Sequence, residues 1–404
     1  VWGKVGMRVS VLLGDVMVYL VAGVVTWWGR TKNRKGWDGD DDDGDESPSL
    51  SVLSSSSSSL LAMFWLVVNP ALVLVDHGHF QYNSVSLGLT VLAAAWVERG
   101  RGLLSTRSRG GRRAHPDPDL YPYLYPYLYL VASSVAFTLA LNHKQMTLYY
   151  APAFGVYLFG LCCVEGTWGH RVGLFVGLGL GVVGTMVGMW APLVVGGGDN
   201  VGSLSVGHRV LRIVRRVFPV HRGLYEDYVA NFWCVSSMVY KWRVRWDRGA
   251  LARLCLVGTL AASAPALVLG FVGVVRHRDT GTKTGQSRIF PLMLASVSLS
   301  FYLFAFQVHE KSILMAATAV ALVGDGKVAG RVQSIAMMTM YPLLKKDGLV
   351  VAYWAMQGLV VVVGGWDWWV GGTLAVVHAV GGFVRVEGKD FLEECGRVCL
   401  QQPG

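Results

Sequence analysis

Charged side chains are scarce in this sequence. Asp, Glu, Lys and Arg make up 15% of its 404 residues, whereas 53% are hydrophobic and the mean hydropathy is +0.43. A water-soluble domain needs more polar side chains than this to cover its surface. The composition therefore excludes an ordinary soluble domain and indicates a chain whose solvent is a lipid bilayer.

Cysteine is scarce as well, and its positions fit no disulfide framework. Two of the six cysteines are adjacent, two lie in or beside apolar runs and two lie in the C-terminal tail; they are Cys162, Cys163, Cys234, Cys255, Cys395 and Cys399. We interpret them as buried or unreactive thiols, because free cysteine is commonly a buried structural residue.

Long apolar runs supply the predicted membrane helices. Crossing the hydrocarbon core takes about 20 helical residues, since ~30 Å must be covered at ~1.5 Å per residue. The longest runs are 9–28, 172–198, 254–275 and 289–308. Shorter runs that could also be helices are 60–75, 84–97, 128–141, 332–344, 349–366 and 370–384. We predict an all-α polytopic membrane protein with about ten to twelve helices, forming one domain over residues 1–404.

Basic loops beside these runs account for the formal net charge of +10. They do not form an amphipathic face with interleaved aromatic side chains, so we expect no nucleic acid partner. Loops rich in Lys and Arg face the cytosol. We therefore predict a cytosolic Arg-rich loop at 98–120 and a disordered, cytosolic, acidic and serine-rich insertion at 36–59. The repeated Tyr-Pro-Tyr-Leu at 121–128 predicts an interfacial entry to a span, because proline breaks a regular helix.

Four polar islands interrupt the apolar runs, at residues 76–83, 142–150, 215–234 and 307–311. Ionisable groups at membrane spans are costly and indicate function by default. Counting alternate spans from a cytosolic first loop places the first three islands in the lumen. The loops 241–253 and 276–288 are both basic, although only one span, 254–275, separates them. We take 276–288 as the cytosolic loop, which places the fourth island in the lumen as well.

The first island reads as a polar rim that faces water or a polar substrate. Its candidates are Asp76, His77, His79, Gln81 and Asn83. An ordinary helix–turn–helix with satisfied interfacial side chains would carry the same residues. A metal site is the third interpretation, but His-x-His alone is a weak signal and no second ligand cluster has a suitable spacing. We predict no metal.

The other islands also admit two interpretations each. In the third, Arg216 and Arg222 suit phosphate while Glu226 and Asp227 suit sugar hydroxyls, with Asn231 following; lipid headgroups and local ion pairs would explain the same residues. In the fourth, the candidates are His309, Glu310 and Lys311, and the alternative is an interfacial end of a span. The second island offers Lys144 and Gln145, where Lys144 could simply extend toward water.

The four islands resemble the signature motifs of the dolichyl-phosphate-glucose-dependent glucosyltransferases of the endoplasmic reticulum. The matching strings are DHGHFQYNSVSLG from Asp76, LNHKQMTLYYA from Leu141, RRVFPVHRGLYEDYVANFWC from Arg215 and FQVHEKSIL from Phe306. They occur in the family's order, over roughly residues 7–349. HGHFQYNSV and RGLYEDYVANFWC resemble the branch that adds the first glucose more than the branch that adds the second.

The resemblance implies a GT-C-type transmembrane bundle with short lumenal loops, in the endoplasmic reticulum membrane. It implies an inverting transfer of glucose from dolichyl-phosphate-glucose to a dolichyl-pyrophosphate-linked high-mannose acceptor, with membrane lipids around the protein and no bound cofactor. By matching position, His309 and Arg222 would face the phosphate, and Asp76, His79, Gln81, Glu226 and Asp227 would shape the sugar pocket. The expected acidic base lies upstream of Val1, so we expect the chain to be truncated at both ends.

Three other functions are compatible with the sequence. The chain could belong to the second-glucose branch, or be a catalytically inactive lipid-binding or assembly protein. It could also be a transporter or scramblase, because polar residues between spans mark substrate pathways. The two halves share no internal similarity, and the islands lie at span ends and not near the midplane, which disfavours transport.

Overall fold

The computed structural model describes residues 2–27, 50–109, 121–164, 166–195, 205–217, 229–237, 239–276, 288–365, 368, 371–375 and 378. Within these ranges the chain is helical and contains no β-strand. The first half comprises α1 (Trp2–Gly14), the π-helix η1 (Asp15–Leu20), α3 (Leu50–Val68), α4 (Pro70–Gly78), α5 (Asn83–Arg109), α6 (Tyr121–His143), the 3₁₀ helix η2 (Gln145–Tyr150), α7 (Ala151–Val164) and α8 (Trp168–Val195). The second half comprises α9 (Val206–Val217), α10 (Phe232–Ser236), α11 (Trp242–Arg245), α12 (Arg248–Arg276), α14 (Ile289–Phe304), the 3₁₀ turn η3 (Glu310–Ser312), α15 (Ile313–Val323), α16 (Gly326–Thr339), α17 (Tyr341–Lys346) and α18 (Val350–Gly364).

Six helical stretches in the described ranges are long and apolar enough to cross a membrane. They are Arg8–Trp27, Ser57–Gly78, Leu124–His143, Gln145–Val164, Trp168–Val195 and Arg248–Arg276. Two shorter apolar helices, α14 and α18, accompany them. The chain is an all-α polytopic membrane protein, as its composition predicts.

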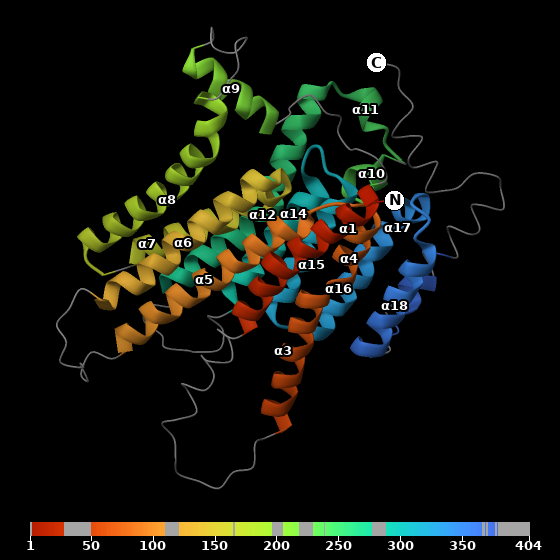
Figure 1. Ribbon diagram of the computed structural model, residues 1–404, viewed down its shortest axis with the longest axis horizontal. Helices are drawn as coiled ribbons and strands as arrows, with labels where there is room; N and C mark the ends of the chain where they lie inside the picture. Colours follow the sequence, from red (N-terminus) through yellow and green to blue (C-terminus); the bar gives the residue numbers. More distant parts are fainter. Residues whose placement is uncertain are drawn as a thin grey trace.

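Helix α15 occupies the centre of the bundle. Nine of its eleven residues are buried, and it packs against α14, α16 and α3 (Figure 1). Helices η1, α5, α6 and α8 pack side by side in that order, and α7 joins them to α12 and α14. The outer helices α8 and α12 expose large apolar side chains such as Leu180 and Leu269. Lipid is the natural solvent for these faces.

A buried asparagine and a proline break the second span. Asn69 adopts φ 35°, accepts from the Leu72 backbone N–H and donates to the Tyr19 and Thr318 hydroxyls. Pro70 then opens α4, where its missing N–H leaves no helical hydrogen bond unmade. This break sets the direction of α4, which ends at the first polar island.

Three sequence predictions need correction. The tract 121–128 is helical: Pro122 lies in the first turn of α6, which needs no N–H donors, and only Pro126 lies inside the helix. Residues 98–109 continue α5 as a helix, and residues 50–59 form the start of α3, so neither stretch is a loop or disordered. Good helix formers and apolar residues flank the serine run, so the helix extends through it. Residues 36–49 and 110–120 lie outside the described ranges.

Candidate functional site

The polar islands meet at one end of the bundle, the upper end in Figure 1, where α4, α6 and α14 end and α5 begins. Lys144 of the second island hydrogen-bonds Gln81 and Asn83 of the first. Trp233 of the third island donates from Nε1 to the carbonyl oxygen of Phe304, next to the fourth. A hydrogen bond between the side chains of Tyr149, in the second island, and Ser312, which directly follows the fourth, brings these two islands together. Loops separated by up to about half the chain thus share one polar region.

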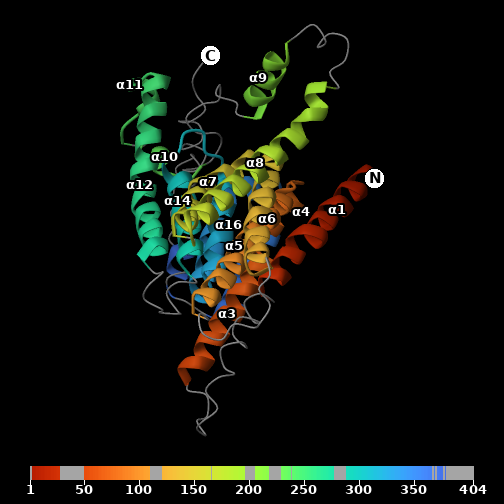
Figure 2. The same cartoon turned by 90° about the vertical axis from the view of Figure 1, so that its left-hand side faces the viewer.

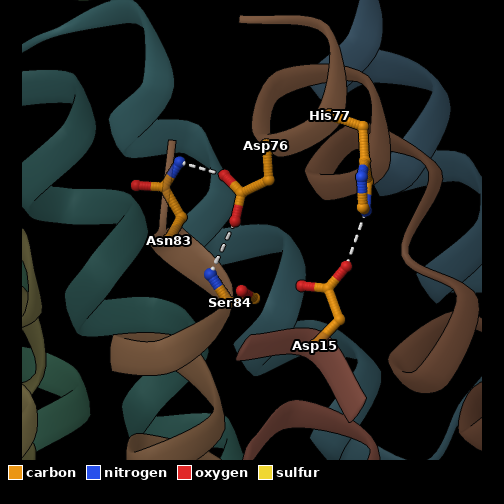
Figure 3. Close-up of polar contacts among 5 residues, drawn as sticks. All are labelled: Asp15, Asp76, His77, Asn83 and Ser84. Atoms are coloured by element: carbon orange, nitrogen blue, oxygen red, sulfur yellow. Dashed lines mark hydrogen bonds and ion pairs between the residues drawn. The ribbon is translucent and has the colours of Figure 1, made fainter. Parts of the chain in front are cut away.

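Asp76 holds the turn between α4 and α5. It is 1% exposed, its Oδ1 accepts from Asn83 Nδ2 at 2.6 Å, and its Oδ2 accepts from the Ser84 backbone N–H at 2.8 Å (Figure 3). The carboxylate therefore satisfies a free donor of the first turn of α5 and lies at the positive end of that helix. Asp76 organises the site whether or not it also touches a substrate.

Lys144 is the cation of this cluster. Its Nζ donates to Gln81 Oε1 at 3.0 Å and to Asn83 Oδ1 at 2.5 Å. Burial lowers the pKa of the Lys144 ammonium to about 8; the Asp76 carboxylate acts in the opposite direction, and the nearby charge of Lys311 lowers it further. The side chain does not simply extend into water: it is bound by two amides.

A second acid–base pair lies beside Asp76. His77 Nε2 is 2.6 Å from Asp15 Oδ2, and Figure 3 shows the two side chains pointing toward each other across the gap between α4 and η1. Asp15 Oδ1 is buried and has no hydrogen-bond partner among the described residues. Asp15 is the first residue of η1, the π-helical segment of the first span, and π-helical segments are frequent at functional sites. The sequence offers one signal for Asp15, since it is the single charge in the run 9–28.

His79 pairs with a carboxylate that sequence reasoning missed. Its Nδ1 lies 2.7 Å from Oδ2 of Asp347, which follows α17. The Leu349 side chain packs over Gly78 in the same region. Asp347 lies in a short polar turn after Lys346, where nothing in the sequence separates it from an ordinary exposed turn residue.

The fourth island contains buried ionisable groups on an irregular backbone. Glu310 is 1% exposed and Lys311 is 6% exposed. His309 Nδ1 lies 2.9 Å from Glu310 Oε2. This distance is within the range of an ion pair, but the angles are not those of a hydrogen bond. Gln307 has φ 63° and Phe80, in the first island, has φ 54°. Non-glycine residues adopt this conformation at a cost, and such residues concentrate at functional sites.

The remaining candidate residues are not part of the hydrogen-bonded cluster around Asp76 and Lys144, or lie outside the described residues. Gln145 begins η2 with an exposed side chain beside Lys144. Asn231 is buried and caps α10 by accepting from the Cys234 backbone N–H, while its Nδ2 has no partner among the described residues. The Arg216 side chain, Arg222, Glu226 and Asp227 lie outside the residues that can be described. In the described ranges no three His, Cys, Asp or Glu side chains gather into a metal-binding group.

Comparison with known proteins places this polar region in a family. The ALG6, ALG8 glycosyltransferase family matches residues 3–376. A probable dolichyl pyrophosphate Man9GlcNAc2 alpha-1,3-glucosyltransferase of Arabidopsis thaliana is 32% identical over 366 residues, which are 89% of this chain and 55% of the relative. Its counterpart in Dictyostelium discoideum is 30% identical over 90% of this chain and 58% of the relative. The dolichyl pyrophosphate Man9GlcNAc2 alpha-1,3-glucosyltransferase of Saccharomyces cerevisiae is 29% identical over 87% of this chain and 53% of the relative. The chain spans between half and three-fifths of the length of these curated relatives. All four polar islands fall within the residues that the family model matches. The chain therefore belongs to the ALG6, ALG8 glycosyltransferase family.

Proposed function

We propose that this chain acts in the transfer of glucose from dolichyl-phosphate-glucose to dolichyl-pyrophosphate-linked Man9GlcNAc2, forming an α-1,3 linkage in the lumen of the endoplasmic reticulum. The observation that carries the proposal is the meeting of the described parts of the four family motifs at one end of a membrane bundle. Both substrates are lipid-linked, so a site at the end of the spans meets their headgroups where they emerge from the bilayer.

The reaction is a single displacement at the anomeric carbon. The acceptor 3-hydroxyl oxygen forms the new bond, the bond from the β-linked glucose to the phosphate oxygen breaks, and the configuration inverts to α. The phosphate takes the bonding electron pair, and a carboxylate base takes the hydroxyl proton.

The cations of the described residues suit the departing phosphate. Lys144 and Lys311 lie close enough for the charge of Lys311 to lower the pKa of Lys144; Lys311 is buried and Lys144 is half-buried. Fixed cations in such surroundings stabilise developing negative charge more strongly than they would in water. His309, next to the buried Glu310, supplies a further donor. Gln81 and Asn83, oriented by Lys144 and Asp76, offer amide groups to sugar hydroxyls.

The test is a glucose-transfer assay in microsomes that lack the endogenous enzyme. The full-length gene product is supplied with labelled dolichyl-phosphate-glucose and, separately, with Man9GlcNAc2 or its monoglucosylated form on dolichyl pyrophosphate. We expect label on the unglucosylated acceptor. Label only on the monoglucosylated acceptor would assign the chain to the second-glucose branch, and no transfer to either would overturn the proposal.

A matched pair of variants ties the activity to the site. Lys144→Gln removes the half-buried cation, whereas Lys327→Gln removes an exposed lysine at the start of α16, at the opposite end of the bundle. We expect Lys144→Gln to lower transfer by at least an order of magnitude, in line with the loss of a charged transition-state contact, and Lys327→Gln to leave it unchanged. Equal activity in both variants would remove Lys144 from the mechanism.

A further inference from the structure

Helix α9 separates its polar and apolar side chains on two faces. At 100° per residue, Val206, Val210, Ile213 and Val214 fall on one side of the helix. The opposite side carries the basic residues His208, Arg212 and Arg215, and Arg209 and Leu211 lie at the two boundaries between the sides. The helix contains no acidic residue. A partner for α9 must therefore be apolar on one side and anionic on the other.

The bundle does not supply that partner within the described ranges. The element with which α9 makes its main contacts is α8, and Figures 1 and 2 show α9 outside the bundle, beside the upper end of α8. Val206 is 63% exposed and Leu211, at the edge of the apolar face, is 44% exposed. Arg212 and Arg215 are exposed as well. Val210, Ile213 and Val214 are half-buried, so the apolar face is partly covered and is most open to something beyond the protein at Val206.

The position of α9 identifies the partner as the membrane surface. Helix α8 is a membrane span that ends at Val195, and Arg209 donates from a guanidinium nitrogen to the Val194 carbonyl at 2.8 Å. This bond holds α9 against the end of α8. Trp190, one turn earlier, donates to Asn142 Oδ1, so this end of α8 is also the end that carries the polar cluster.

We propose that α9 lies in the bilayer interface beside the polar cluster, with Val210 and Ile213 among the acyl chains and Arg212 and Arg215 paired with lipid phosphates. An amphipathic helix of this kind buries its apolar face by ~5–10 Å at the headgroup boundary. Arginine is suited to the polar face because its planar guanidinium binds phosphate oxygens in pairs. The segment 218–228, which carries Arg222, Glu226 and Asp227, follows α9 directly in the sequence.

Site-specific photo-crosslinking tests this placement in the intact protein. A benzophenone amino acid is introduced at Ile213 or at His208, which is exposed on the basic face, and each protein is irradiated in nanodiscs of phosphatidylcholine with and without phosphatidylglycerol. Mass spectrometry then measures acyl-chain adducts. We expect several-fold more acyl adduct at Ile213 than at His208, and more adduct at Ile213 when the anionic lipid is present.

Charge variants test the arginine contacts separately. Arg212→Gln combined with Arg215→Gln is expected to lower the Ile213 acyl adduct in phosphatidylglycerol nanodiscs, and Arg212→Lys combined with Arg215→Lys to restore part of it, because lysine keeps the charge but loses the paired geometry. Equal adduct at Ile213 and His208, or adducts to protein only, would overturn the proposal. Lipid adducts that form only after addition of a polyprenyl phosphate would also overturn it and identify a substrate contact instead.

Discussion

Lys144 changes its charge within the range of ordinary assays. Burial holds its pKa at about 8, below the usual lysine value. The ammonium is therefore charged below pH 8 and is lost as pH rises through that value. If the charge stabilises the departing phosphate, glucose transfer falls above pH 8. Lys144→Arg, whose group stays charged at every accessible pH, is expected to move this fall to higher pH in a pH–rate profile.

The same shift has the opposite effect on stability. Because the folded pKa of Lys144 lies below its unfolded value, the unfolded chain binds more protons between pH 8 and the usual lysine range, and stability rises with pH there. If activity falls above pH 8 while Tm rises, the loss of activity comes from loss of the Lys144 charge and not from unfolding. A fall in both quantities above pH 8 would contradict the role given to Lys144.

Asp76 yields a second prediction at this scale. Asp76→Asn keeps the shape but presents an amide N–H₂ to two donors, Asn83 Nδ2 and the Ser84 N–H, of which only one can then be accepted. An unsatisfied buried donor costs ~1–3 kcal/mol. We expect a lower Tm and reduced transfer, measured by thermal unfolding and the transfer assay. Asp347→Asn, which alters a half-exposed pair with His79, is the control and should lower Tm much less.

The residue types of the site can be predicted from sequence, whereas their pairings cannot. Polar residues in an apolar chain are conspicuous, so Asp76, Asn83 and Lys144 are identified by their positions beside spans. That Asp15 faces His77 depends on how η1 packs against α4 and α5. The periodicity of side chains along one helix does not tell which other helix packs against it.

At the scale of elements, the close approach of η1 to α5 positions Asp15. A Cβ on Gly88 would lie 2.9 Å from Tyr19 Cα and 3.0 Å from Tyr19 N, which are backbone atoms that cannot turn aside. Glycine at a helix interface permits this approach. We therefore expect Gly88→Ala to push η1 away from α5, separate Asp15 from His77, and cost ~1–3 kcal/mol by overpacking.

The control for Gly88→Ala is Gly184→Ala on the outer helix α8. Gly184 is exposed, and a Cβ added there would have no heavy atom within 4 Å among the described residues, so alanine at this position meets only lipid. Thermal unfolding and the transfer assay should report losses for Gly88→Ala and none for Gly184→Ala. Equal behaviour of the two variants would mean that the η1–α5 contact does not control the site.

Helix breaks show where local sequence rules succeed and fail. Proline at 126 is expected to prevent regular helix, yet α6 includes it, because one lost hydrogen bond near the helix start is offset by packing of the whole span against α5. By contrast, the break at Asn69 and Pro70 lies inside the apolar run 60–75, where hydropathy alone indicates one continuous span. The buried hydrogen bonds of Asn69 to Tyr19 and Thr318 are tertiary and stabilise a break that no local pattern indicates.

At the scale of the molecule, the two ends of the bundle differ in chemistry. The polar cluster, the end of α8 and α9 lie at one end, and α5 extends away from it for 27 residues, or about 40 Å. The far end of α5 carries Arg99, Arg101, Arg107 and Arg109, and Arg112 and Arg113 follow it in the sequence, so the positive-inside rule predicts that this end faces the cytosol. The cluster should then face the lumen, where the proposed reaction requires it.

Glycosylation mapping tests this orientation directly. The sequence contains no Asn-x-Ser/Thr acceptor, in which x is any residue except proline, so any N-glycan on a variant must come from an inserted site. Acceptor sites carried on flexible Gly/Ser insertions are placed within 196–204, which follows α8, or within 110–120, which follows α5. We expect a glycosidase-sensitive mobility shift for the first insertion and none for the second, with glucose transfer retained in both. A shift from the second insertion alone would reverse the orientation, place Lys144 and Asp76 on the cytosolic side, and require a donor that is presented there.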